Sequence, residues 1–243
     1  MSGTTPRFAA AGEQEASRWV REMFGRVAPR YDLLNHVLSF QLDKRWRAKT
    51  VERVAPMLRP GAVVLDLCCG TGDVLLALEK ARGAAVLGSD FCHPMLVEAN
   101  RKIAARHYKT SLFESDALQL PFRNSSADLI TVSFGFRNFA NYESGLRELY
   151  RALKPGGCLA VLEFSQPTNP VFAALYGFFS MKVLPKVGGW ISGASDAYTY
   201  LPESIRKFPN AEGLAAKMRE AGFSRVEFER MTFGAVALHL AWK

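Results

Sequence analysis

The stretch from Val63 to Asp73 constrains the fold of this chain more than any other part of the sequence. A short apolar run ends in Asp66, and a turn built on Gly70 and Gly72 follows at once. This pattern predicts a buried parallel strand, a tight glycine turn and then a helix over residues 74–80. Because glycine has no Cβ atom, the backbone of such a turn can approach a ligand closely.

A second carboxylate follows at the spacing that doubly wound folds use to hold a ribose. The apolar run 84–89 ends in Asp90, roughly 20 residues past the first glycine of the turn. Two carboxylates at successive strand ends are hard to explain by core packing alone, so we expect a nucleoside ligand. Leu75 stands where a dinucleotide fingerprint has its third glycine, which disfavours a nicotinamide cofactor. The segment resembles the Rossmann-like methyltransferases that use S-adenosylmethionine, with Cys68 in place of the usual first glycine.

The remaining hydrophobic pattern alternates between strand and helix periods. Strands are expected at 63–66, 84–90, 111–116, 128–134, 158–164, 225–231 and 235–242, and helices at 14–27, 43–57, 74–80, 94–107, 142–152 and 212–221. Such alternation indicates an α/β fold with a mostly parallel, seven-stranded sheet and helices on both faces. The last two strands have no helix between them, which indicates an antiparallel C-terminal hairpin.

Composition is consistent with one domain spanning residues 1–243. We expect residues 1–60 to form an N-terminal helical region over the substrate, and the apolar, proline- and glycine-rich segment 167–210 to form a lid-like insertion.

The four cysteines lack zinc-ligand spacing, and no apolar stretch at the N-terminus has the length of a signal peptide. The sequence thus predicts a cytoplasmic protein without a metal. The net charge of +8 indicates an anionic partner, either nucleic acid or a membrane surface.

Several longer segments resemble one methyltransferase family. Residues 30–40, followed by Arg45-Trp46-Arg47, resemble the N-terminal signature of the menaquinone/ubiquinone biosynthesis C-methyltransferases. Residues 151–157 with 162–165 look like that family's second signature, and the segments 66–73, 133–138 and 198–204 also match its pattern. The resemblance covers nearly the whole chain. The family often has Gly and His where this chain has Gln41 and Asp43.

The resemblance implies methylation of a ring carbon of a polyprenylated quinol by S-adenosylmethionine. The main expectation is conversion of demethylmenaquinol to menaquinol, favoured by Gln41 and the Cys68–Cys69 pair; the alternative is the benzoquinol step of ubiquinone biosynthesis, or both. On the cofactor side we expect Asp66, Gly70, Thr71, Gly72, Asp90, Asp116, Ala117 and Ser133. On the substrate side we expect Tyr31, Asp32, Arg137 and Asn138, with the last two gripping a quinol oxygen. The general base stays open among Asp32, His36, Asp43, Glu163 and Arg137.

The sequence also bears on three alternatives: a nucleic-acid methyltransferase, a binding protein without activity, and a protein that acts at a membrane. Nucleic-acid methyltransferases carry an Asn/Asp-Pro-Pro-aromatic or a Pro-Cys stretch after the fourth strand, where this chain has residues 133–137, so no nucleic-acid partner is expected. A binding protein without activity would not need the segments around Tyr31 and Arg137. The apolar run 171–181, followed by Lys182 and Lys186, is too short to span a bilayer. It is either a lid on the inner membrane surface or a core helix. A homo-oligomer is left open.

Overall fold

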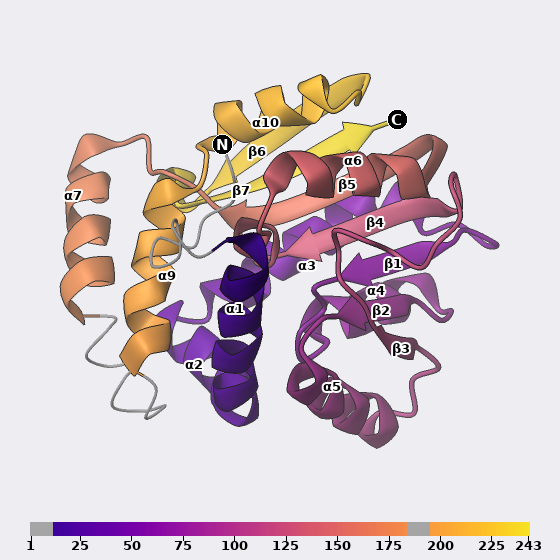
Figure 1. The fold of residues 1–243 in the computed structure, drawn as a ribbon, viewed down its shortest axis with the longest axis horizontal. Coiled ribbons are helices and arrows are strands. Elements are labelled where there is room, and N and C mark those ends of the chain that lie inside the picture. The colour runs from indigo at the N-terminus through magenta and orange to yellow at the C-terminus, as the bar shows by residue number, and fades with distance from the viewer. Residues whose placement is uncertain (1–11, 184–194) are drawn as a thin grey trace.

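The protein folds around one seven-stranded mixed sheet (Figure 1). The computed structural model describes residues 12–183 and 195–243. The strand order is β3 (Ser111–Glu114), β2 (Leu87–Asp90), β1 (Val64–Leu67), β4 (Ala127–Ser133), β5 (Leu153–Phe164), β7 (Val236–Trp242) and β6 (Arg225–Met231). The first five strands are parallel, and β7 runs antiparallel to both β5 and β6. The predicted fold class is therefore confirmed.

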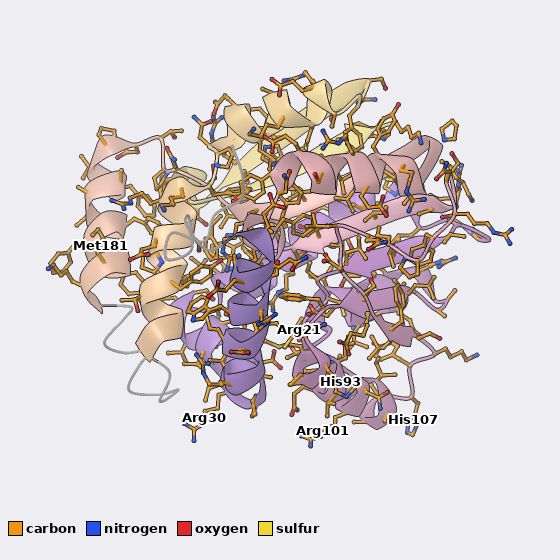
Figure 2. All side chains as sticks on the ribbon, viewed as in Figure 1. Arg21, Arg30, His93, Arg101, His107 and Met181 are labelled. Carbon is orange, nitrogen blue, oxygen red and sulfur yellow. The ribbon has the colours of Figure 1, made fainter. Side chains whose placement is uncertain are left out.

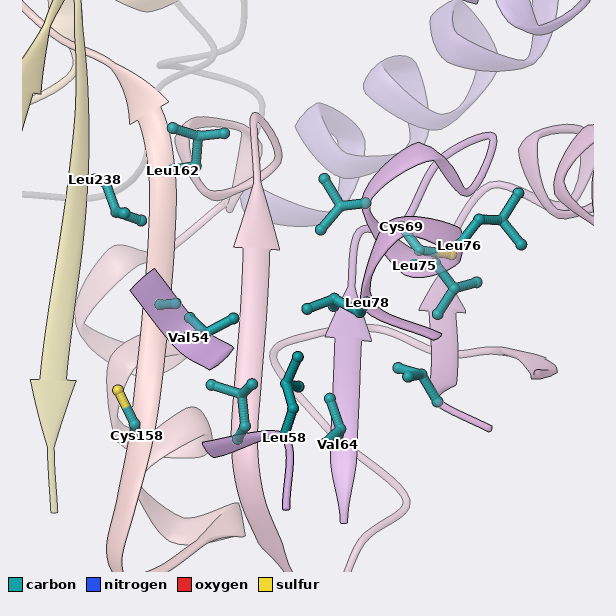
Figure 3. Close-up of a cluster of buried hydrophobic side chains, with 14 of the residues drawn as sticks. Val54, Leu58, Val64, Cys69, Leu75, Leu76, Leu78, Cys158, Leu162 and Leu238 are labelled. Atoms are coloured by element: carbon teal, nitrogen blue, oxygen red, sulfur yellow. The ribbon is translucent and has the colours of Figure 1, made fainter. Parts of the chain in front are cut away.

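Alternate side chains of the central strands supply two separate cores. Val64 and Leu129 belong to a cluster with the apolar side chains of α3 (Leu42–Val54) and α4 (Asp73–Arg82), which Figure 3 shows. Their neighbours Leu65 and Ile130 belong to the opposite cluster, with α6 (Tyr142–Ala152) and α10 (Ala211–Glu220). Because both faces are covered, β1 is buried at all four positions and its sequence is a short apolar run.

Most predicted boundaries agree with the structure within a few residues, and three differ. The strand expected at 158 begins at Leu153, because Leu153 already pairs with Ala127 of β4. The helix expected over 43–57 ends as an α-helix at Val54 and continues as a 3-10 turn, Ala55–Met57, that contains a proline. Strand β2 begins only at Leu87. The remaining helix of the sheet layer, α5, spans His93–Ala105.

A group of helices lies at the carboxyl ends of the parallel strands, where the arrows of β1, β4 and β5 point (Figure 1). It consists of α1 (Glu13–Val27), a 3-10 turn (Ala28–Arg30), α2 (Tyr31–Leu38), α7 (Pro170–Phe178) with a π-turn (Phe179–Val183), and α9 (Ser195–Lys207). A third apolar cluster joins α1, α2, α5 and α9, with Val20, Leu34, Met95 and Tyr200 among its buried members. In open parallel sheets, ligands bind at this end of the strands, next to the point where the strand order reverses. That reversal lies between β1 and β4.

Candidate active site

A cavity of about 70 Å³ lies at the ends of β1, β2 and β4. Its lining contains five of the residues predicted for the cofactor, namely Gly70, Asp90, Asp116, Ala117 and Ser133. The hydroxyl of Ser133 is buried and has no hydrogen-bond partner among the described residues. A buried polar atom without a partner is costly, so this hydroxyl is suited to a ligand in the cavity.

Asp90 is held by the backbone and presents a carboxylate to this cavity. Its Oδ2 accepts from the backbone N–H of Gly70 at 2.9 Å, and its Oδ1 accepts from that of Cys92 at 2.9 Å. An ionised carboxylate has further lone pairs, which suit the two hydroxyls of a ribose. Burial raises the pKa of Asp90 to about 6, against the lowering effect of these hydrogen bonds. The carboxylate is therefore ionised at neutral pH, at a cost in desolvation.

Helix α1 forms part of the wall of this cavity. Ser17 and Phe24 of α1 contribute to the lining. Arg21, labelled between α1 and α5 in Figure 2, donates to the backbone oxygen of Phe91 at 2.6 Å and to Glu114 at 2.8 Å. These contacts join α1 to the segments that follow β2 and end β3, and so hold α1 beside the cavity.

Three residues predicted for the cofactor lie outside the lining of both cavities. Asp66 accepts from the Thr131 hydroxyl at 2.5 Å across β1 and β4, and burial raises its pKa to about 7. The Thr71 hydroxyl donates to Asp32 at 2.5 Å. Gly72 has a φ of 85° and starts α4. Asp66 therefore bonds to β4, Thr71 bonds to α2, and Gly72 precedes the first residue of α4.

A larger, mainly apolar cavity of about 370 Å³ lies beside the first. Phe24, Tyr31 and Phe134 line both cavities and so form the partition between them. Phe40 and Leu175 line the larger cavity although they are 72% and 65% exposed, which places its mouth between α2 and α7. The arrangement gives a polar compartment and an apolar compartment that share one wall.

One charged group in the wall of the larger cavity is Arg137, which forms a buried ion pair with Glu163. The guanidinium lies 2.9 Å from Glu163 Oε1, and the backbone N–H of Arg137 donates to Oε2 at 3.1 Å. Burial alone would lower the pKa of Arg137, but Glu163 raises it, and the net pKa is raised. Burial also raises the pKa of Tyr176 and Tyr200 to about 12. The cavity therefore keeps a permanent cation beside neutral phenol hydroxyls.

The four residues predicted for the substrate side do not share one cavity. Arg137 and Tyr31 line the larger cavity. Asn138 lines the smaller one instead, and its Oδ1 accepts from the Tyr200 hydroxyl at 3.0 Å. Asp32 lines neither cavity, because it pairs with Lys102 and accepts from Thr71. The prediction of Arg137 and Asn138 as a pair gripping one substrate oxygen does not match this geometry.

Acidic and basic side chains from α2, α3 and α4 line or support another part of the larger cavity. Asp43 and Arg47 belong to its lining and form an ion pair of 2.9 Å. His36 lies 2.7 Å from Asp43, and Arg47 lies 2.5 Å from Asp73 at the start of α4. These contacts run from His36 of α2 through Asp43 and Arg47 of α3 to Asp73 of α4. Because α2 and α4 are separate helices, they hold the Asp43 side chain in place from two directions.

Residues 10–243 match the model of the ubiE/COQ5 methyltransferase family. The chain belongs to this family. The match confirms the resemblance derived from the sequence, and it confirms that the protein is a methyltransferase whose methyl donor is S-adenosylmethionine. The donors and acceptors of the smaller cavity fit that cofactor, with Asp90 suited to the ribose and Asp116 to the adenine amino group.

Two relatives agree with this assignment, and a solved structure agrees with the fold. The chain is 50% identical over 219 residues to a demethylmenaquinone methyltransferase of Thermus thermophilus, covering 90% of this chain and 98% of the relative. It is 39% identical over 239 residues to the ubiquinone/menaquinone biosynthesis C-methyltransferase UbiE of Cereibacter sphaeroides, covering 97% and 95%. A SAM-dependent methyltransferase structure from Thermotoga maritima has a TM-score of 0.64 at 19% identity, covering 91% of this chain and 99% of that one.

The sequence did not predict several side chains that line the larger cavity. Tyr176 and Tyr200 lie in its wall, and Trp46 and Phe164 form part of its aromatic lining. The family-like segment 198–204 contained Tyr200 but no pattern in the sequence assigned it to the cavity. No group of acidic, His or Cys side chains suited to a metal occurs within residues 12–183 and 195–243. In the same ranges, no helix is long and apolar enough to cross a membrane.

Proposed function

We propose that this protein methylates a ring carbon of a polyprenylated quinol, converting a demethylmenaquinol to the menaquinol. One observation carries the proposal: an apolar cavity of about 370 Å³ with Arg137 in its wall adjoins the cofactor-type cavity, and the two share Phe24, Tyr31 and Phe134 in their linings. An aromatic ring in the larger cavity would thus lie next to the methyl group of a cofactor in the smaller one.

The chemistry requires little from the protein beyond alignment and charge. S-adenosylmethionine supplies a sulfonium methyl group that is already a strong electrophile. When a quinol hydroxyl loses its proton, the negative charge spreads onto the neighbouring ring carbon. A cofactor in the smaller cavity would supply its methyl group to the electron pair of that carbon, and its sulfur would keep the pair of the bond that breaks. The ring proton would pass to water and the phenolate oxygen would take a proton back, so that one proton is released for each methyl group transferred. The guanidinium of Arg137 stabilises the developing phenolate, and the partition residues hold the ring in line.

A naphthoquinol is the preferred head group in this proposal. The relative with 50% identity is named a demethylmenaquinone methyltransferase, whereas the relative named for both quinones is 39% identical. The benzoquinol step of ubiquinone biosynthesis remains the second candidate. Turnover with demethylmenaquinol and with the benzoquinol precursor, each bearing the same prenyl chain, distinguishes the two.

Substitution of Arg137 tests the proposed role in catalysis. We expect Arg137→Ala to lower kcat by about 100-fold, since a preorganised charge at a developing oxyanion contributes on this scale. The affinity for S-adenosylmethionine should change little, because Arg137 lies outside the smaller cavity. Arg147→Ala, which removes an exposed arginine of α6, is the matched control. Loss of cofactor affinity together with turnover would assign Arg137 to folding or to the cofactor site.

We further propose that the substrate enters from a membrane surface to which α7 binds. The side chains of α7 are exposed or half-buried, and Tyr176 is among the half-buried ones. Phe172, Leu175 and Tyr176 of α7 line the cavity, as does Phe179 just after it, whereas Val171 and Phe178 are exposed and lie outside the lining. Large apolar side chains are exposed on α2 and just after it, on α7 and just after it, and at a position that packs against α7. They are Leu33, Val37, Phe40, Val171, Leu175, Phe178, Met181 and Phe233, and the ring centroid of Phe233 is 5.0 Å from that of Phe172. An apolar face around the cavity mouth suits the acyl region of a bilayer, where the prenyl chain of the substrate is dissolved.

Liposome flotation tests the membrane proposal. Leu175→Ser with Phe178→Ser should reduce binding to vesicles of anionic lipid, since two of the exposed apolar side chains are lost. Val97→Ser, at an exposed position of α5 that is 39% accessible, is the control. Binding should also weaken at high salt if the basic residues contribute. Equal flotation of wild type and double variant would contradict this role for α7.

A further inference from the structure

We propose that Asp43 selects the reduced form of the substrate, because its carboxylate accepts a hydrogen bond from a ring hydroxyl of the quinol and disfavours the carbonyl of the quinone. The inference rests on the proposed function and deepens it, since it names the residue that distinguishes the two redox states. Asp43 belongs to the part of the larger cavity's wall that α3 forms.

The carboxylate of Asp43 has one acceptor position toward the cavity that no donor among the described residues occupies. The residue lines the cavity, although only 3% of its surface is exposed. Its Oδ2 accepts from His36 Nδ1 at 2.7 Å and from Arg47 at 2.9 Å, and its Oδ1 accepts from the Ser39 hydroxyl at 2.7 Å. An ionised carboxylate has about four acceptor sites. The three protein donors therefore fix its orientation and leave one site for a ligand.

An aromatic cluster connects Asp43 with Arg137 along the cavity wall. Trp46 lies one helical turn after Asp43, on the same side of α3, and its ring centroid is 6.0 Å from that of Phe134 and 6.4 Å from that of Phe164. The guanidinium of Arg137 lies 5.3 Å from the centroid of Phe164. A flat ring held against this cluster meets an acceptor-only group from α3 and a donor-only group from the 3-10 turn Phe136–Asn138 that follows β4.

This polarity matches a quinol and not a quinone. A quinol that has lost one proton offers one negative oxygen to Arg137 and one hydroxyl donor to Asp43. A quinone has two carbonyl oxygens and no donor, so one of them would face the carboxylate without a hydrogen. A site built to bind a substrate hydroxyl rejects an analogue that lacks it, because the buried partner is left unpaired. Only the quinol has the electron-rich ring carbon that methyl transfer needs.

The structure supplies a matched pair of variants for the test. Asp43→Asn keeps the size of the side chain but adds an N–H₂ donor that can serve a carbonyl. Asp73→Asn removes the same charge from the same network, since Asp73 also pairs with Arg47, but Asp73 lies outside the cavity lining. The probes are 2-farnesyl-1,4-naphthoquinone and its dithionite-reduced quinol, and their affinities are measured by calorimetry without oxygen.

We expect the wild type and Asp73→Asn to bind the quinol at least about tenfold more tightly than the quinone, and Asp43→Asn to reduce that ratio to about threefold or less. A tenfold preference raises the midpoint potential of the bound two-electron couple by about 30 mV. An unchanged ratio in Asp43→Asn, or a wild type without any preference, overturns the inference.

The potential measured with the wild type also decides the matter if Asp43→Asn does not fold. A rise in the midpoint potential then supports the inference, and no rise overturns it. Failure of the proposed function would be seen separately, as absence of methyl transfer from S-adenosylmethionine to demethylmenaquinol by the wild type.

Discussion

The buried ion pair of Arg137 and Glu163 makes a prediction about stability that can be worked from its contacts. Glu163 is 1% exposed and accepts from three donors: the Arg137 guanidinium at 2.9 Å, the Arg137 backbone N–H at 3.1 Å and its neighbour's backbone N–H at 2.8 Å. Glu163→Gln removes the charge and replaces one of the two acceptor oxygens with a donor. Arg137 is then a buried cation without its anion.

Removing one partner of a buried ion pair typically costs about 3–5 kcal/mol. Since the amide of Gln keeps one acceptor oxygen, we expect about 3 kcal/mol for Glu163→Gln. For a chain of this length, 1 kcal/mol corresponds to roughly 2–4 °C in Tm, so Tm should fall by about 6–12 °C. Urea unfolding followed by circular dichroism, together with calorimetry, measures both quantities.

Two further variants serve as controls for the stability of Glu163→Gln. Glu52→Gln makes the same substitution in the exposed pair with Lys49 and should cost less than about 1 kcal/mol. Arg137→Met combined with Glu163→Gln removes the uncompensated cation and should recover part of the lost stability. A loss below about 1 kcal/mol in Glu163→Gln would refute the reasoning, because the pair would then not be desolvated as the structure indicates.

Three other predictions concern the cofactor cavity and the glycine turn. Asp90→Ala should weaken binding of S-adenosylmethionine by about 2 kcal/mol or more, since two hydroxyls lose their acceptor, and unchanged affinity in calorimetry would remove Asp90 from the site. Because the pKa of Asp90 is raised to about 6, cofactor affinity of the wild type should be highest above pH 6 and fall as the pH drops through that value, whereas Asp90→Asn should bind with little pH dependence between pH 5 and 8. Gly135→Ala would place a Cβ 2.3 Å from the Cβ of Cys68 and should cost about 1–3 kcal/mol in thermal unfolding; Cys68→Gly in the same chain should restore the stability, and failure to do so would mean that another contact is responsible.

The sequence by itself determined the sheet and the cofactor type. The strand and helix periods are local, since they depend on neighbouring residues in one segment. The glycine turn and Asp90 belong to strand ends that any doubly wound fold brings to one edge, so the smaller cavity followed from their order along the chain. The family signatures added the substrate class, which no period or spacing contains.

The tertiary structure alone decided which side chains share a cavity. Asn138 follows Arg137 directly, yet the two residues line different cavities, because the chain turns between the end of β4 and α6. The wall of the larger cavity combines residues of α2 and α3 with Tyr176 and Tyr200, which come from segments far along the chain. Contacts across such separations depend on how the helices pack on the sheet. The sequence pattern of each helix predicts that it has an apolar face, but not which residues that face contacts.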